Sequence, residues 1–222
     1  MSYRLFLFDL DGTLVDTSPG IMASVRHVEQ RLGLSPLPEE TLRRFIGPPL
    51  EDSFMKYYGA DPAQARRMVD VYRERYGVTG FREGRVYPGI LEALDAIEAA
   101  GCVAAVATLK HHEMAALSLK AFGLGHRFAA VAAGTDQHPS KADLIRQAMG
   151  ELGWEDPASA VMLGDSRYDG VGALEAGVDF AAAAYGFGFG EPGSMDGLDP
   201  VFVAESPEAL GEFIRRSLPR EG

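Results

Sequence analysis

The feature that most constrains how this chain can fold is a short stretch near its beginning, where an apolar run ends abruptly in two carboxylates. The run from Tyr3 to Phe8 favours a buried strand, and Asp9 and Asp11 follow it. If the backbone stays extended through Asp11, both carboxylates project to the same side, and Gly12 then permits a sharp turn. Two carboxylates held this close repel each other unless a cation lies beside them, and Mg²⁺ favours oxygen ligands of this kind. The stretch therefore predicts a strand that ends in a polar site.

The composition of the chain limits which classes of protein it can belong to. The chain has 222 residues, 46% of them hydrophobic, which is enough for one full core and a smaller insert. Its formal net charge of −11 argues against a nucleic-acid or anionic-membrane partner, so an anionic substrate would need a locally positive site. The single cysteine, Cys102, lies in an apolar run and is expected to be a small core residue. Because Asp9 and Asp11 interrupt the first apolar run, we expect neither a signal peptide nor a membrane span, and a cytoplasmic location.

Residues 17–82 have the pattern of a helical block. Apolar residues recur at helical spacing, and Ser18 followed by Pro19 is a typical helix start. Gly77, Gly80 and Gly84 then punctuate a return segment. The predicted helices span residues 18–32, about 39–47, 50–58 and 61–76.

From Pro88 onward, helices and strands alternate. The predicted helices cover 88–100, 111–122, 140–152, about 168–176 and 206–217, and the predicted strands cover 102–107, 128–133, 160–163, 178–184 and 201–203. Repeated units of this kind, with strands apolar throughout, predict an α/β fold with a Rossmann-like parallel sheet covered by helices on both faces. The helical block after the first strand then predicts a small all-helical cap domain, residues 17–82, inserted into a core domain of residues 1–16 and 83–222.

Polar residues follow the predicted strands where those strands end. In open α/β sheets, ligands bind outside the carboxyl ends of the strands, so these residues are candidates for one shared site. After Asp9 and Asp11 they are Thr108, the run 134–136, Asp165 and Asp169.

Four of these segments together resemble the motifs of the haloacid dehalogenase superfamily of phosphohydrolases. The run Asp9-Leu10-Asp11-Gly12-Thr13 resembles its first motif, and Thr108 its second. Lys141 resembles the lysine of the third motif, and the segment 164–169 resembles the acidic fourth motif. Order, spacing and placement at strand ends agree over nearly the whole chain, so the resemblance implies this fold and a phosphatase.

The resemblance implies a role for each acidic residue. Asp9 would attack phosphorus and form an aspartyl-phosphate, and Asp11 would act as general acid and then general base. Mg²⁺ would be held by Asp9, the backbone carbonyl of Asp11 and Asp165, with Asp169 either a direct ligand or a residue that orients the ligands.

The remaining motif residues would bind the substrate phosphate. Thr108 would donate a hydroxyl and Lys141 a positive charge to the non-bridging oxygens, beside Gly12 and Thr13 of the first motif.

Taken one at a time, several of these residues could have purely structural roles. Asp9 and Asp11 could cap the loop that follows the strand, and Thr108 could simply end a strand. Lys141 could be a solvated residue in the first turn of a helix, and Asp169 a capping acid.

One segment departs from the family pattern, and another resembles a motif of a different family. Leu109 stands where many relatives have asparagine or serine, and Lys110-His111 follows in place of lysine-proline, so any polar contact by that first side chain is lost. The glycine-rich run 185–190 superficially suggests a dinucleotide-binding loop, but no β-α-β unit follows, and we expect a flexible loop at the rim of the site. The scattered histidines make a zinc site improbable.

A helical insert between the first two motifs resembles the cap class that phosphoglycolate phosphatases, β-phosphoglucomutases and haloacid dehalogenases share. Asp11 disfavours a dehalogenase, and no histidine follows the first motif closely enough to favour a mutase. We therefore expect a Mg²⁺-dependent phosphomonoesterase for a small phosphorylated metabolite, phosphoglycolate first. The alternatives are a 5'-nucleotidase, a phosphomutase, or a catalytically silent binding protein.

Cap side chains would select the leaving group of the substrate. Arg43, Arg44 and Lys56 are candidates to bind a carboxylate or a second anionic group, and Arg44 is our first choice. No nucleic-acid or membrane partner is expected, and the protein would be a monomer or a homodimer.

Overall fold

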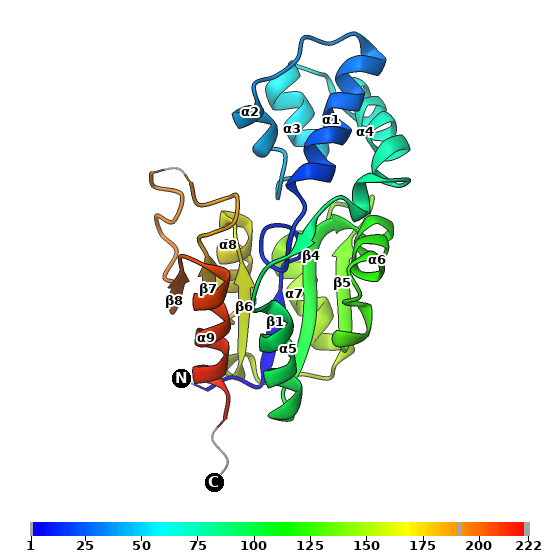
Figure 1. The fold of residues 1–222 in the computed structure, drawn as a ribbon. Helices are drawn as coiled ribbons and strands as arrows, with labels where there is room; N and C mark the ends of the chain where they lie inside the picture. The colour runs from blue at the N-terminus through cyan, green and yellow to red at the C-terminus, as the bar shows by residue number, and fades with distance from the viewer. Residues whose placement is uncertain (1, 191, 220–222) are drawn as a thin grey trace.

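The computed structural model describes residues 2–190 and 192–219, which form a sheet flanked by helices with a separate group of helices above it (Figure 1). In these residues the main sheet has six strands in the order β5-β4-β1-β6-β7-β8, and every neighbouring pair is parallel. The strands are β1 (Leu5–Phe8), β4 (Val103–His111), β5 (Ala130–Gly134), β6 (Ala160–Gly164), β7 (Asp179–Ala183) and β8 (Phe202–Ala204). The predicted parallel sheet is therefore confirmed. The last three residues of the predicted core domain, 220–222, lie outside the described residues.

Helices cover both faces of the sheet, because the strands are apolar on both sides. Phe6 and Phe8 of β1 pack into one buried cluster, and Leu5 and Leu7 pack into another on the opposite face. The first cluster is closed by α5 (Ile90–Ala99), α6 (His112–Ala121) and α9 (Pro207–Ser217), and the second by α7 (Lys141–Glu151) and α8 (Arg167–Ala176). The central strand β1 is thus buried along its whole length.

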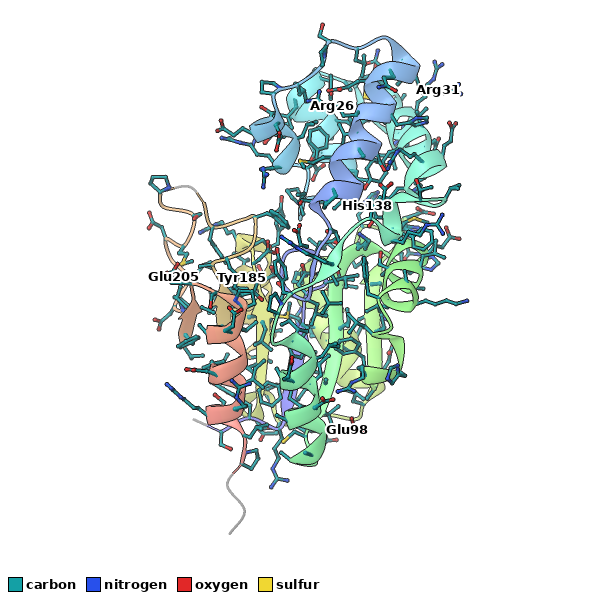
Figure 2. All side chains as sticks on the ribbon, in the orientation of Figure 1. Arg26, Arg31, Glu98, His138, Tyr185 and Glu205 are labelled. Atoms are coloured by element: carbon teal, nitrogen blue, oxygen red, sulfur yellow. The ribbon has the colours of Figure 1, made fainter. Side chains whose placement is uncertain are left out.

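The group of helices above the sheet has its own apolar core. It contains α1 (Ser18–Leu32), α2 (Glu39–Arg43), α3 (Leu50–Tyr58) and α4 (Pro62–Tyr76), whose buried side chains form a third cluster. Figure 2 places Arg26 and Arg31 on this insert, and His138 at the junction between the insert and the sheet. The helical insert is confirmed, whereas its boundaries at residues 17 and 82 remain a prediction.

The chain enters and leaves the insert through a small ladder that was not predicted from the sequence. β2 (Val15–Asp16) pairs antiparallel with β3 (Arg85–Val86), and the short 3₁₀ helix Gly80–Arg82 precedes β3. Strands of two residues carry too little periodicity to be recognised in a sequence. The ladder ties the two connecting segments together.

Three local expectations need correction. Strand β4 continues past Ala107 to His111, with an irregular register against β5 between Thr108 and His111. Cys102 is only partly buried, packing at the edge of the core rather than inside it. Helix α2 ends at Arg43, four residues before its predicted end near Gly47. The other elements begin and end close to their predicted residues. In the part of the chain that the structure describes, no helix is long and apolar enough to cross a membrane.

Close packing at the base of the insert gives a stability prediction. A Cβ added at Gly20 in α1 would lie 2.0 Å from the backbone carbonyl oxygen of Gly80, which cannot move aside cheaply. We expect Gly20→Ala to lower the free energy of unfolding by about 1–3 kcal/mol in urea titrations. Gly150→Ala in α7 is the matched control, because its added Cβ meets nothing within 4 Å, and it should be neutral or slightly stabilising. Equal effects of the two substitutions would contradict this packing effect.

Candidate active site

The predicted site residues meet at the carboxyl edge of the sheet, because β1 lies between β4 and β6. Phe8 is in register with Val106 on one side and Leu163 on the other. The residues that follow these positions therefore converge, and they bring Asp9 and Asp11, Thr108, and Asp165 to one place.

Three buried carboxylates form the centre of the site. One carboxylate oxygen from each of Asp9, Asp165 and Asp169 lies within 4.8 Å of the others, and the three residues are no more than 5% exposed. The Oδ1 atom of Asp165 is buried and has no hydrogen-bond partner in the described residues. Three hard oxygen donors around one point, one of them unsatisfied, fit a divalent cation such as Mg²⁺.

Burial makes this cluster costly to ionise. Burial raises the pKa of Asp9 to about 6 against the opposing effect of Lys141, and burial together with Asp169 and Asp9 raises the pKa of Asp165 well above its usual range. Without a metal, the folded protein therefore holds these groups at an energetic cost.

Lys141 supplies the compensating positive charge. Its Nζ lies 2.8 Å from Asp9 Oδ1, 2.7 Å from Asp169 Oδ1 and 2.9 Å from the carbonyl oxygen of Ala107. Burial opposes the charge on Lys141, but Asp169 and Asp9 outweigh it and raise the pKa of the lysine. The side chain has room because position 172 in α8 is a glycine, where a Cβ would lie only 2.6 Å from Lys141 Cγ. The structure thus places Lys141 inside the site rather than in solvent.

The ends of helices α7 and α8 hold these groups in position. Ser140 and Asp143 form a capping box at the start of α7, which fixes the first turn that carries Lys141. At the start of α8, Asp169 Oδ2 accepts hydrogen bonds from the backbone N–H and the hydroxyl of Ser166, at 2.9 and 2.6 Å. Asp169 therefore caps its helix with one oxygen and faces Lys141 with the other.

Asp11 lies beside this cluster and has a different partner. Both of its carboxylate oxygens accept hydrogen bonds of 2.9 Å from Lys110 Nζ, and both side chains are nearly buried. The same Nζ lies 4.6 Å from the ring centroid of Tyr76, at the end of α4 in the insert. In the sequence, Lys110 stands out only as a departure from a motif. Its pairing with Asp11 could not be predicted because the two residues are 99 positions apart.

The residues around Asp11 are held by a tight turn. Gly12 has φ +79°, and a Cβ there would lie 2.2 Å from Asp165 Oδ2. The hydroxyl of Thr13 is buried without a partner in the described residues. Thr108 is 1% exposed, and its hydroxyl accepts a hydrogen bond from the backbone N–H of Lys110 at 3.3 Å. Gly12 therefore lies directly against a site carboxylate, and Thr13 and Thr108 are buried residues close to Gly12 and Lys110.

The glycine-rich run 185–190 is also part of the site, which corrects its interpretation as a flexible rim loop. The backbone N–H of Phe187 donates to Asp165 Oδ2 at 2.7 Å, and the hydroxyl of Tyr185 donates to the carbonyl oxygen of Thr13 at 2.7 Å. A Cβ at Gly186 would lie 2.3 Å from Asp165 Cβ. The alternating glycines in the sequence were the available signal, since they permit backbone to approach the carboxylate closely.

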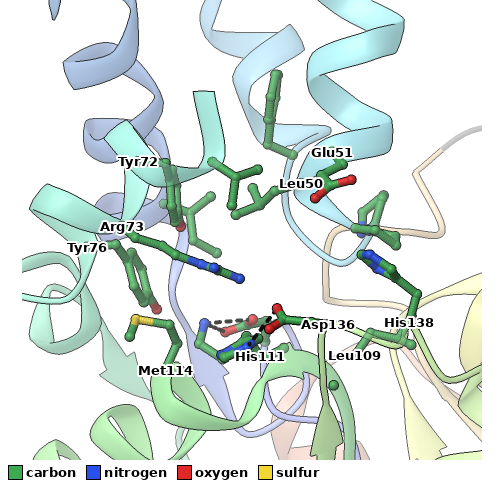
Figure 3. A pocket seen from close by; sticks show the side chains of 18 of the residues that line it. Leu50, Glu51, Tyr72, Arg73, Tyr76, Leu109, His111, Met114, Asp136 and His138 are labelled. Atoms are coloured by element: carbon green, nitrogen blue, oxygen red, sulfur yellow. Dashed lines mark hydrogen bonds and ion pairs between the residues drawn. The ribbon is translucent and has the colours of Figure 1, made fainter. Parts of the chain in front are cut away.

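A cavity of about 420 Å³ opens above Asp11, between the insert and the sheet (Figure 3). Its inner wall is largely apolar and comes mainly from the insert, with Ile21, Phe45, Leu50, Val69, Tyr72 and Tyr76 on that side and Leu109 and Met114 below. Its polar lining includes Arg73, His111, Asp136 and His138, and His111 Nε2 lies 3.4 Å from Asp136 Oδ1.

The predicted substrate-binding residues of the cap lie elsewhere. Arg44 has an exposed side chain whose Nη2 is 3.4 Å from Glu40 Oε1, and Arg44 does not line this cavity. Arg43 pairs with Glu39, and Lys56 lies over the ring of Tyr57. The structure therefore does not bring Arg44 to the other site residues.

The raised pKa of Asp9 sets the pH dependence of the metal-free protein. An aspartate in an unfolded chain titrates near pH 4, whereas Asp9 in the folded protein titrates near pH 6. Between these values the folded state binds more protons, so the free energy of unfolding falls as the pH rises from about 4 to about 6. Calorimetry without metal should give a lower Tm at pH 7 than at pH 5, and Mg²⁺ should raise the Tm more at pH 7. In Asp9→Asn the difference between the two pH values should shrink; an unchanged difference would contradict this assignment.

The pair formed by Lys110 and Asp11 gives a second prediction. Lys110→Met leaves a nearly buried carboxylate without its partner, so we expect a loss of about 3–5 kcal/mol in the free energy of unfolding at pH 7. Lys56→Met is the matched control, because Lys56 is exposed on the insert, and its loss should cost less than about 0.5 kcal/mol. Urea unfolding measures the free energy of unfolding of both variants. Equal losses would show that the buried pair contributes no more to stability than an exposed lysine does.

Comparison with curated proteins finds relatives over nearly the full length of the chain. It is 40% identical over 218 residues to a 5'-nucleotidase of Pseudomonas aeruginosa, covering 96% of each chain. It is 32% identical over 226 residues to a phosphoglycolate phosphatase of Agrobacterium fabrum, covering 98% of this chain and 95% of the other.

Solved structures and family models agree with these relatives. The fold matches the crystal structure of a predicted phosphatase from Clostridium acetobutylicum with a TM-score of 0.88 and 32% identity, over 97% of this chain and 100% of the other. A family model described as haloacid dehalogenase-like hydrolase matches residues 6–183, which include every strand-end residue discussed above. The chain belongs to the haloacid dehalogenase-like hydrolases.

Proposed function

We propose that this protein is a Mg²⁺-dependent phosphatase that hydrolyses a small phosphate monoester through an aspartyl-phosphate on Asp9. The observation that carries the proposal is the buried cluster of Asp9, Asp165 and Asp169 around Lys141, next to the separate acid Asp11. Similarity to phosphatases over nearly the whole chain supports it.

In the first step, a carboxylate oxygen of Asp9 forms a bond to phosphorus while the bond from phosphorus to the ester oxygen breaks. Asp11, once protonated and released from Lys110, donates its proton to the departing alkoxide. In the second step, a water molecule attacks phosphorus, Asp11 takes its proton, and the bond from phosphorus to Asp9 breaks to release phosphate. Asp9 and Asp11 have different partners, Lys141 and Lys110. Because both oxygens of Asp11 accept hydrogen bonds from Lys110, at least one of these bonds must break before Asp11 can carry and donate a proton.

Asp9 and Asp165 would hold the metal, with the backbone carbonyl of Asp11, while Asp169 either joins them or orients Lys141. When bound there, Mg²⁺ would offset the negative charge of the carboxylates and of the phosphate and so lower the barrier to attack. Lys141 and the hydroxyl of Thr108 would contact the non-bridging oxygens of the phosphate. The hydroxyl of Thr13 is buried without a partner in the part of the chain that the structure describes, and it would be a further candidate donor.

The cavity favours a nucleoside 5'-monophosphate as the substrate over phosphoglycolate, our first expectation from the sequence. Phe45, Leu50, Val69 and Tyr72 present apolar surface to the leaving group, and glycolate offers only two carbons and a carboxylate to such a wall. A nucleoside has a large planar base that can bury against it. The 40% identity to a 5'-nucleotidase supports the same substrate class. Phosphoglycolate remains the second candidate.

Phosphate release with Mg²⁺ tests the proposal on a panel of nucleoside monophosphates, sugar phosphates and phosphoglycolate. Wild-type protein should hydrolyse nucleoside monophosphates best. Asp9→Asn should lower kcat on the order of a thousandfold or more, because the side-chain amide is a far poorer nucleophile. Thermal unfolding of the variant is the control for folding. Persistent release in Asp9→Asn would disprove the nucleophile, and no release by folded wild-type protein would favour a silent binding protein.

A further inference from the structure

Helix α4 presents one continuous face to the cavity. Arg66, Val69, Tyr72, Arg73 and Tyr76 all line it, and their spacing of three and four residues puts them on one side of the helix. The end of this face at Tyr76 is the one nearest the catalytic carboxylates. The ring of Tyr76 contacts Lys110, and Lys110 donates hydrogen bonds to Asp11. The face therefore runs outward from the reacting end along the space for the leaving group.

Arg73 is the notable charge on this face. Figure 3 shows its guanidinium extending from α4 into the cavity, with Tyr72 beside it and His111 and Asp136 below. Its side chain is half-buried, and the guanidinium has no ion-pair or hydrogen-bond partner among the described residues. By contrast, Arg75 on another side of the same helix makes two hydrogen bonds to Glu83, at 2.8 and 2.9 Å.

The other charges of the cavity do not explain Arg73. Lys110 is paired with Asp11, and His111 lies against Asp136. The remaining charged side chains of the lining are Arg66 and the two acids Glu51 and Asp70. Neither Glu51 nor Asp70 forms an ion pair with Arg73. A guanidinium carries five N–H donors and no acceptor, so withdrawing it partly from water without acceptors costs free energy. A bound molecule that supplies acceptors would remove that cost.

We propose that Arg73 is the residue that determines substrate specificity, by donating hydrogen bonds to carbonyl or ring-nitrogen acceptors on the nucleobase of a nucleoside 5'-monophosphate. This inference rests on the proposed function. Lys141 serves the reacting phosphate at the edge of the sheet, whereas Arg73 comes from the insert and lies among apolar and aromatic walls. A base combines the planar apolar surface that those walls fit with the acceptors that Arg73 lacks.

Three substrates separate the possible ligands of Arg73. Uridine 5'-monophosphate has a planar base with acceptors, 1-naphthyl phosphate has a planar group without them, and phosphoglycolate has a carboxylate acceptor without a planar group. Steady-state kinetics with Mg²⁺ would be measured for wild-type protein, for Arg73→Met and for the control Arg67→Met. Arg67 lies on the same helix, is exposed and does not line this cavity.

We expect Arg73→Met to raise KM for uridine 5'-monophosphate about tenfold to a hundredfold, the usual effect of losing a hydrogen bond from a charged donor. Its kcat/KM for 1-naphthyl phosphate should stay within about twofold of wild type, and Arg67→Met should change kcat/KM for neither substrate by more than that. An equal loss on all three substrates would overturn the inference, because Arg73 would then bind the transferred phosphate. A loss confined to phosphoglycolate, or no loss on the nucleotide, would also overturn it.

The same experiment separates this inference from the proposed function. Turnover of 1-naphthyl phosphate by wild-type protein, abolished in Asp9→Asn, tests the phosphatase chemistry without involving Arg73. If that turnover is present while Arg73→Met leaves the nucleotide KM unchanged, only the role of Arg73 fails. If folded wild-type protein turns over none of the three substrates, the proposed function fails first. Thermal unfolding confirms that each variant is folded.

Discussion

The structure depends on neutralising buried carboxylates at one edge of a parallel sheet. Asp9, Asp165 and Asp169 are withdrawn from water within a few ångströms of one another, and only Lys141 among the described residues bonds to more than one of them. Coulomb repulsion between such groups is strong where water is excluded, so the arrangement is stable only with cations at the centre. The lysine supplies one positive charge and leaves the cluster ready for a metal.

The charged side chains of the site lie so close to the backbone that several neighbouring positions have room only for glycine. A Cβ at Gly164 would lie 2.2 Å from Asp169 Cγ, and one at Gly172 would displace Lys141. Gly12 and Gly186 similarly bring backbone against Asp165. These glycines come from four separate segments, and each makes room for a charged side chain. Packing around the site is therefore set by the charges rather than by the apolar core.

The second buried lysine connects the chemistry to the insert. Lys110 holds both oxygens of Asp11 and also lies over the ring of Tyr76, so the acid of the core and a helix of the insert share one cation. The cavity between them therefore has charged side chains on the side of the sheet and mainly apolar side chains on the side of the insert. Such a space suits a substrate with a phosphate at one end and a larger apolar group at the other.

Much of the fold could be predicted from the sequence, because the patterns that indicate helices and strands involve only neighbouring residues. Helices 50–58 and 207–217 have end signals and periodicity that indicate them without tertiary context, and the apolar strands indicate a sheet covered on both faces. Asp9, Asp11, Thr108, Asp165 and Asp169 stood out as candidates because each follows an apolar strand, whereas Lys141 was predicted from its resemblance to a family motif. Arg44 shows the limit of sequence reasoning: a cap arginine is recognisable in a sequence, but the face of the insert it lies on is not.

By itself, the sequence determined the class of fold, the order of elements and the acidic residues at the strand ends, because these follow from periodicity and composition over a few neighbouring residues. Only the tertiary structure decided that β1 lies between β4 and β6, that Lys110 pairs with Asp11, and that the loop at Phe187 contacts Asp165. It also decided that Arg73 rather than Arg44 lies in the cavity. Those contacts join residues far apart along the chain, and which of them form depends on how whole elements pack against one another.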